Sequence, residues 1–255
     1  MANTLLILLS AVLPVLTLSA SVNVGIINGT EAKPHSRPYM VSVQKDSMHI
    51  CGGFLVSPLF VMSAAHCHID DLTVVLGAHD LSDKKTDNGR VRVKNPFIHP
   101  HYNPGTFEND IMLLQLEKEV KLNQNVQLIP LPVEGEDVKP ESVCTVAGWV
   151  ATGNNKAPVD RLQEANVIVM GHQACQGWRN YFVPSSMICV GGKEGFCKGD
   201  SGGPLVCGAT AVGVVSFLQE GKCEKPDVPN VYTKISAFLP WIKHIIGGTE
   251  HATGQ

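Results

Sequence analysis

The sequence predicts an all-β protein, folded as a sandwich or barrel of short strands. Most of its apolar runs are short and rich in Val, Ile and Leu, and Gly, Pro, Asn and Asp residues separate them. Only the end of the chain shows the apolar spacing of a helix. The 255 residues are 44% apolar and 17% charged, which is enough apolar material for the core of one medium domain or two small ones.

The first element, Leu5–Leu18, is almost wholly apolar, and the small residues Ser19, Ala20 and Ser21 follow it. Such a run is too short to span a bilayer comfortably and is typical of a signal peptide, here cut near Ala20. A buried core strand is the alternative interpretation. No other segment approaches about 18 apolar residues, so we expect no membrane span.

Nine short apolar runs bounded by turn residues are the predicted strands. They are Tyr39–Gln44, Phe60–Ala64, Leu72–Leu76, Ile111–Leu116, Val143–Trp149, Ala165–Val169, Pro204–Cys207, Ala211–Phe217 and Val231–Ile235. The polar stretch Val133–Ser142 is the expected junction between two halves of the chain.

The last element is the predicted helix. Phe238, Trp241, Ile242, Ile245 and Ile246 recur at helical spacing. The pair Gly247-Gly248 is expected to end the helix, and the polar tail Thr249–Gln255 is expected to fray.

Charge and cysteine usage exclude several classes of function. The formal net charge of −3 argues against nucleic acid as the main partner, because phosphate binding needs a basic face. The eight cysteines form no CxxC pair, and the only tight Cys/His run is His66-Cys67-His68, whose neighbouring side chains cannot easily converge on one ion. Four disulfides are the better interpretation for an exported chain, and we expect no metal ion and no cofactor.

The strongest local signal for chemistry is Gly199-Asp200-Ser201-Gly202-Gly203-Pro204. A serine hydroxyl is a poor nucleophile until a base removes its proton and donors hold the oxyanion that forms. Glycines around the serine let the backbone turn sharply and direct N–H groups at one point. By itself the string is also compatible with a plain turn.

Two further signals match it. His66 follows the apolar run Phe60-Val61-Met62, and a histidine can act first as base and then as acid near neutral pH. Asp110 opens the apolar run Ile111–Leu114, where a carboxylate is costly to bury without a partner such as a histidine N–H. A lone core histidine and a turn aspartate are the structural alternatives. Together, in the order His66, Asp110, Ser201, the three indicate a catalytic triad.

With these motifs, the chain from about Ile26 to Ile246 resembles the chymotrypsin-fold serine proteases. It is most similar to the group of granzymes, mast-cell proteases and complement factor D, through Ile26–Ala32 and Pro34–Met40. The resemblance implies two six-stranded antiparallel barrels with a C-terminal helix, and a site between the barrels. His66 and Asp110 would come from the first barrel and Ser201 from the second.

The resemblance also implies the roles of further residues. The backbone N–H groups of Gly199 and Ser201 would form the oxyanion hole, each contributing about 3 kcal/mol to transition-state stabilisation. The implied disulfides are Cys51–Cys67, Cys144–Cys207, Cys175–Cys189 and Cys197–Cys223.

Domain organisation and activation follow from the same resemblance. Residues 1–20 would be the signal peptide, 21–25 an activation propeptide and 26–255 the protease domain, with the barrel boundary near 133–142. Cleavage after Gly25 would free the amine of Ile26 to pair with Asp200, because a buried ammonium and carboxylate stabilise each other. Since Gly25 is not basic, the expected activator is a dipeptidyl peptidase rather than a trypsin-like enzyme. The sequon at Asn28 is a glycosylation candidate.

The substrate pocket is predicted from family positions. Gly195 would lie at its floor, where trypsin-like enzymes carry Asp, so tryptic activity is not expected. Phe196 and Leu218 would narrow the pocket and Asn230 would lie at its back, which favours an elastase-like preference for a small aliphatic residue at P1, just before the cleaved bond. Also assigned to substrate binding are Lys198, Ser216 and Phe217; residues 216–218 would pair with the substrate backbone as an added strand.

The expected partners are protein or peptide substrates and protease inhibitors. We expect a monomer that is secreted and that secretory granules could store. The rival hypothesis is a binding or signalling protein on the same fold, either without catalysis or with an intact triad behind an occluded pocket. A secreted digestive elastase is a third interpretation, against which Gly25 argues.

Overall fold

Apolar side chains fold the first half of the chain into a closed barrel of six antiparallel strands. The strands are β2 (Met40–Lys45), β3 (Met48–Ser57), β4 (Phe60–Ser63), β5 (Thr73–Leu76), β6 (Arg90–Ile98) and β7 (Met112–Leu116). Their order around the barrel is β2-β3-β4-β7-β6-β5, and β5 closes the ring against β2. This is a computed structural model, and it describes residues 29–149, 159–177, 184–191, 200–219 and 227–253.

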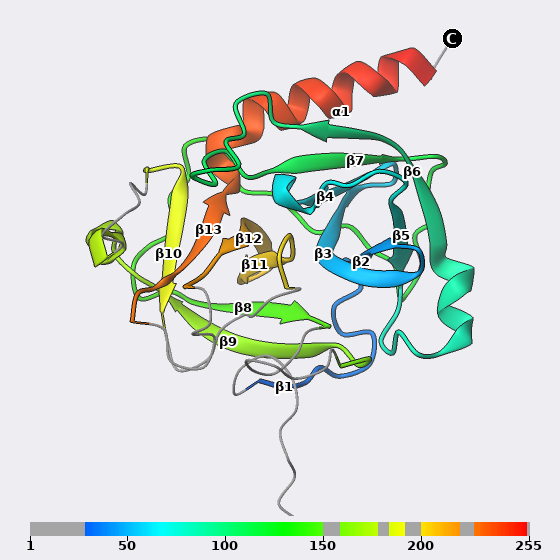
Figure 1. Ribbon diagram of the computed structural model, residues 1–255, viewed down its shortest axis with the longest axis horizontal. Coiled ribbons are helices and arrows are strands. Elements are labelled where there is room, and N and C mark those ends of the chain that lie inside the picture. The colour runs from blue at the N-terminus through cyan, green and yellow to red at the C-terminus, as the bar shows by residue number, and fades with distance from the viewer. Residues whose placement is uncertain (1–28, 150–158, 178–183, 192–199, 220–226, 254–255) are drawn as a thin grey trace, which may run out of the picture.

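The second half repeats the architecture. Its strands are β8 (Val143–Gly148), β9 (Gln163–Val169), β10 (Met187–Gly191), β11 (Pro204–Cys207), β12 (Thr210–Phe217) and β13 (Asn230–Lys234). They run in the order β9-β10-β13-β12-β11-β8, and β8 pairs with β9 to close the ring (Figure 1). The predicted fold class, two six-stranded antiparallel barrels with a C-terminal helix, is confirmed.

The two ends of the chain tie the barrels together. The short strand β1 (Thr30–Glu31) pairs with β9 of the second barrel. At the other end, the 3₁₀ turn Ile235–Phe238 and helix α1 (Leu239–Thr253) leave the second barrel and pack against the core of the first (Figure 1). Each end of the chain therefore packs against the barrel that is remote from it in sequence.

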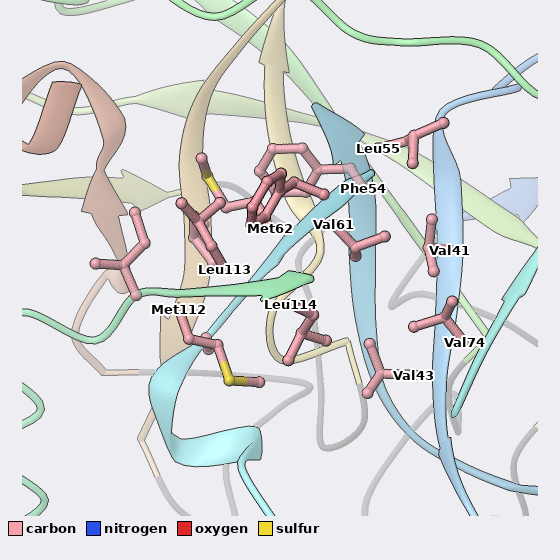
Figure 2. Packing of buried hydrophobic residues seen from close by; sticks show 14 of the residues in the cluster. Val41, Val43, Phe54, Leu55, Val61, Met62, Val74, Met112, Leu113 and Leu114 are labelled. Atoms are coloured by element: carbon pink, nitrogen blue, oxygen red, sulfur yellow. The ribbon is translucent and has the colours of Figure 1, made fainter. Parts of the chain in front are cut away.

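The first barrel holds the largest apolar cluster. Residues of β3, β4 and β7 interdigitate there, and Figure 2 shows Phe54, Val61, Met62 and Leu113 at its centre, all completely buried. Strand β7 is buried along its whole length; four of its five residues are apolar, and the buried Gln115 accepts a hydrogen bond from Asn95. The second barrel has its own core, in which Tyr232 and Leu205 are fully buried.

Three barrel strands, and the short strand β1 outside the barrels, were missed by the sequence analysis. Strand β3 contains Gly52-Gly53, and β6 contains Pro96 next to Asn95, so both appear as turns in the sequence. Tertiary packing overrides the glycine signal. A Cβ at Gly52 would lie 3.1 Å from the backbone of Gly203, and one at Gly53 would lie 2.9 Å from the side chain of Val61 on β4. The third missed strand is β10.

The predicted helix end at Gly247-Gly248 was wrong, because α1 continues to Thr253. A glycine weakens a helix by about 1 kcal/mol but does not block it. Neither glycine here has a left-handed φ, so no turn ends the helix at that point. Among the described residues, no helix is long and apolar enough to cross a membrane.

Three of the expected disulfides are present: Cys51–Cys67, Cys144–Cys207 and Cys175–Cys189. Cys197 and Cys223 lie outside the described residues, as do the predicted signal peptide and propeptide. Strand β7 ends at Leu116 and β8 begins at Val143, and the domain boundary near 133–142 stays a prediction.

Candidate active site

His66 lies immediately after β4, in the 3₁₀ turn Ala65–Cys67. The small buried residues Ala64 and Ala65 let the chain turn tightly against the barrel. The disulfide from Cys67 to Cys51 anchors the turn to β3. The imidazole itself keeps 21% of its side-chain surface exposed, so it is anchored at the edge of the barrel with access to solvent.

Asp110 lies in the turn that leads into β7 and is completely buried. Its Oδ1 accepts a bond from the backbone N–H of His66 at 2.9 Å, and its Oδ2 lies 2.7 Å from His66 Nδ1. A carboxylate can only accept at that position, so Nδ1 carries the proton and Nε2 is left as the acceptor. This is the tautomer that a general base needs.

The second barrel also holds Asp110. The hydroxyl of Ser216 donates to Asp110 Oδ2 at 2.6 Å, and that of Thr233 donates to the Asp110 backbone carbonyl at 2.9 Å. Ser216 is the extra residue of a β-bulge in β12, since Val215 pairs with Tyr232 and Phe217 pairs with Val231. The bulge brings the Ser216 hydroxyl to the carboxylate. Sequence reasoning assigned Ser216 to substrate binding and missed Thr233, which no local pattern marks.

Ser201 lies in the turn just before β11 and is partly buried. Its carbonyl accepts a bond from the N–H of Gly52 on β3 at 2.8 Å, which ties the two barrels together beside the disulfide next to His66. The following residue, Gly202, has φ of +83°, and a Cβ there would overlap Gly52 O and Ser63 Oγ. Glycine is therefore required by both the conformation and the space.

Asp200, the expected partner of the new N-terminus, has 2% of its surface exposed. Its Oδ1 occupies the space that a side chain at position 148 would need, so Gly148 makes room for the carboxylate. Burial, followed by the charge of Asp200, raises the pKa of Tyr232 well above its usual value. A negative charge in this interior favours a cation as its partner.

Phe107 is a site residue that the sequence analysis did not identify. Its ring makes an edge contact with His66 at a centroid distance of 5.6 Å and lies 5.5 Å from the ring of Phe217. Its backbone has φ of +55°, uncommon for an aromatic residue, in the loop that ends at Asp110. Nearby, burial and the charge of Asp110 raise the pKa of Tyr102 to about 12.

Of the residues predicted to bind substrate, those that the structure describes lie on β12, just beyond it and on β13. Phe217 packs against the cluster around Cys175–Cys189, whereas Leu218 packs against the core of the second barrel. Asn230 begins β13 and is buried. Outside the described residues lie Gly195, Phe196, Lys198, Gly199, Ile26 and Asn28.

Within the part of the chain that the structure describes, one group of three residues has the ligand spacing of a metal site: Cys51, His66 and Cys67. The two sulfur atoms are bonded to each other, so neither is a thiolate that could bind an ion. This group therefore serves to anchor the histidine.

Comparison with known proteins places this geometry in a family context. Residues 26–242 match the family described as Trypsin. The chain is 45% identical over 225 residues to mast cell protease 3 of Ovis aries, covering 86% of this chain and 88% of that protein. It is 42% identical over 225 residues to granzyme B of Homo sapiens, covering 86% and 90%. Among solved structures, neuropsin, a serine protease of mouse brain, superposes with a TM-score of 0.81 at 32% identity, over 87% of this chain and 100% of that one.

Proposed function

Because the chain belongs to the trypsin family of serine endopeptidases, we propose that Ser201 is its nucleophile, His66 its base and acid, and Asp110 the group that orients His66. The observation that carries this assignment is the pair of bonds from His66 to the buried Asp110 carboxylate. They hold the ring in the tautomer that presents Nε2 as an acceptor. A binding protein without catalysis is not favoured, since all three groups are present.

The reaction follows the established course for this family. Ser201 Oγ attacks the carbonyl carbon of the substrate while His66 Nε2 takes the hydroxyl proton, and the oxyanion is held by the N–H groups of Gly199 and Ser201. The C–N bond then breaks as His66 gives that proton to the leaving amine, which leaves an acyl ester on Ser201. Water attacks the ester, His66 takes a proton from the water, and its return to Oγ releases the carboxylic acid product.

Asp110 stabilises the imidazolium that forms in each half-reaction. Its carboxylate is completely buried and holds three donors, two from His66 and one from Ser216. A charge in such surroundings interacts more strongly than it would in water. Its fixed position means that no reorganisation is needed when the proton arrives.

The proposed specificity is for a small aliphatic residue at P1. Leu218 is assigned to narrowing the pocket from its position two residues after Ser216, and its side chain packs against the core of the second barrel. Asn230 contributes a buried neutral amide, and Gly195 offers no carboxylate to a basic side chain. Together with Phe196, these residues favour Ala, Val, Thr or Ser over Lys, Arg, Tyr or Phe.

The proposed precursor is inactive until cleavage after Gly25 removes the propeptide. The new Ile26 ammonium would then insert beside the buried Asp200 and order the oxyanion hole. We propose that the chain is secreted through a signal peptide of residues 1–20, with storage in secretory granules before release, and that a dipeptidyl peptidase activates it. The active enzyme would act as a monomer on proteins and peptides and would be controlled by protease inhibitors.

The test is cleavage-site profiling of the chain that starts at Ile26, against a peptide library, with Ser201→Ala as control. Cuts after small aliphatic residues that the control lacks would support both the triad and the pocket. Cuts after Lys, Arg, Tyr or Phe would overturn the assignment of the pocket and leave the triad standing. Equal cleavage by Ser201→Ala would overturn the assignment of the nucleophile, and no cleavage by a folded parent would favour the occluded or non-catalytic alternative.

A further inference from the structure

The backbone carbonyl of Asp110 depends on a side chain from the other barrel. Thr233 is 1% exposed and its Oγ1 donates to this carbonyl at 2.9 Å, across 123 residues of sequence. Among the described residues, no backbone N–H bonds to the same oxygen. Because Asp110 is completely buried, the Thr233 hydroxyl satisfies a carbonyl that water does not reach.

The carbonyl lies in a tight turn that sets the direction of the carboxylate. Asn109 has φ of +57°, and the N–H of Ile111 bonds back to its carbonyl at 2.8 Å. The side chain of Asn109 donates to His101 O, which holds the turn on its outer side. Thr233 holds it on the inner side. A shift of the Asp110 peptide would therefore change the angle at which the carboxylate meets His66.

Thr233 is itself held rigidly. It lies within β13, where it pairs with Met187 of β10 and Val214 of β12. Its branched β-carbon restricts the first side-chain torsion, so the hydroxyl has a defined direction. The second barrel thus presents a fixed donor to a turn of the first barrel.

We propose that Thr233 is a positioning residue that sets the Asp110 carboxylate against His66 and thereby speeds turnover without contacting the substrate. This inference rests on the proposed function. Small displacements of catalytic groups slow a reaction strongly, because the reacting atoms leave their productive geometry. Since Thr233 is buried beneath Asp110, its loss should lower kcat and leave KM nearly unchanged.

The test compares Thr233→Val, which keeps the shape and removes the hydroxyl, with Thr233→Ser, which keeps the hydroxyl and removes a methyl group. Both variants are measured on the best peptide from the cleavage profile. The turnover rate is divided by the concentration of enzyme whose Ser201 is labelled by a fluorophosphonate probe, so that kcat refers to active enzyme. We expect Thr233→Val to lower kcat about tenfold with KM changed less than about twofold. Thr233→Ser should keep kcat within about threefold of the parent.

Thr145→Val on β8 is the matched control, the same substitution in the same barrel at a half-buried position. It should leave kcat unchanged. If Thr233→Val yields no folded protein, Thr233→Ala is compared with Thr233→Ser, since this pair differs only by the hydroxyl. The alanine variant should then be about tenfold slower.

Two outcomes would overturn the inference while the proposed function stands. One is an unchanged kcat in the variants without the hydroxyl. The other is an equal loss in Thr233→Ser, which would show that packing by the methyl group matters instead. A parent without Ser201-dependent turnover would overturn the proposed function, and this inference with it.

Discussion

Replacing Ser216 with Ala tests how the buried carboxylate of Asp110 is stabilised. The hydroxyl donates to Oδ2 at 2.6 Å, and the two residues are 3% and 0% exposed. Without it, the two bonds from His66 are those that remain to the carboxylate among the described residues. A hydrogen bond to a charged group contributes about 1.5–3 kcal/mol to stability, and water cannot easily replace this one. We therefore expect Ser216→Ala to lower the free energy of unfolding by about 2 kcal/mol at neutral pH.

The assay is denaturant unfolding, with every variant also carrying Ser201→Ala so that self-digestion does not interfere. A double-mutant cycle with Asp110→Asn separates the effect of the carboxylate charge from that of side-chain shape. Asparagine has nearly the shape of aspartate, but its amide oxygen is uncharged and accepts a weaker hydrogen bond from Ser216. We expect a coupling energy of about 1 kcal/mol between Ser216 and Asp110.

Ser63→Ala is the matched comparison, since its hydroxyl is equally buried but donates to the neutral carbonyl of Gly52 at 2.8 Å. It should cost about 1 kcal/mol and show no coupling to Asp110→Asn. If Ser216→Ala costs no more than Ser63→Ala, and the cost is the same with Asn at position 110, then the account of a charge-assisted bond is refuted.

Three further predictions concern other parts of the molecule. Gly202→Ala should lower the free energy of unfolding by about 3 kcal/mol, because φ is +83° and the Cβ overlaps Gly52 O. Gly208→Ala, with φ of +62° in open space, should lower it by about 1 kcal/mol in the same denaturant unfolding assay. Phe107→Ala should raise KM about fivefold with little change in kcat, since its ring flanks both His66 and Phe217; a loss confined to kcat would contradict this. Burial and then the neighbouring His101 lower the pKa of His99, so the unfolded chain binds that proton at a higher pH than the folded chain does. The free energy of unfolding should therefore fall as the pH drops below about 6.5, and His99→Gln should reduce this fall in unfolding curves recorded at pH 7.5 and 5.5.

Local signals in the sequence were sufficient for most of the barrel strands. A run such as Ile111–Leu116 belongs to a strand that is buried on both faces, so its nearly continuous apolar composition predicts the strand. The signals failed where tertiary packing overrides composition, as at Gly52-Gly53 in β3 and Pro96 in β6. They also placed the end of the C-terminal helix too early.

His66, Asp110 and Ser201 were identified as candidate catalytic residues because each lies in a short sequence motif that indicates its chemistry without information from the rest of the chain. A glycine-rich turn around a serine, and an acid or a histidine beside an apolar run, are unusual enough to stand out. Their assembly in space could be inferred only through the family resemblance.

The sequence by itself determined the fold class, the family and the three candidate catalytic groups, because these depend on periodicity and on local motifs. Only the tertiary structure decided that Thr233 holds the Asp110 peptide, that Ser216 holds its carboxylate and that Phe107 flanks His66. The two hydroxyl bonds join residues 123 and 106 positions apart on different barrels. Contacts of this kind arise from how one barrel is seated on the other, and no local pattern in the chain encodes that.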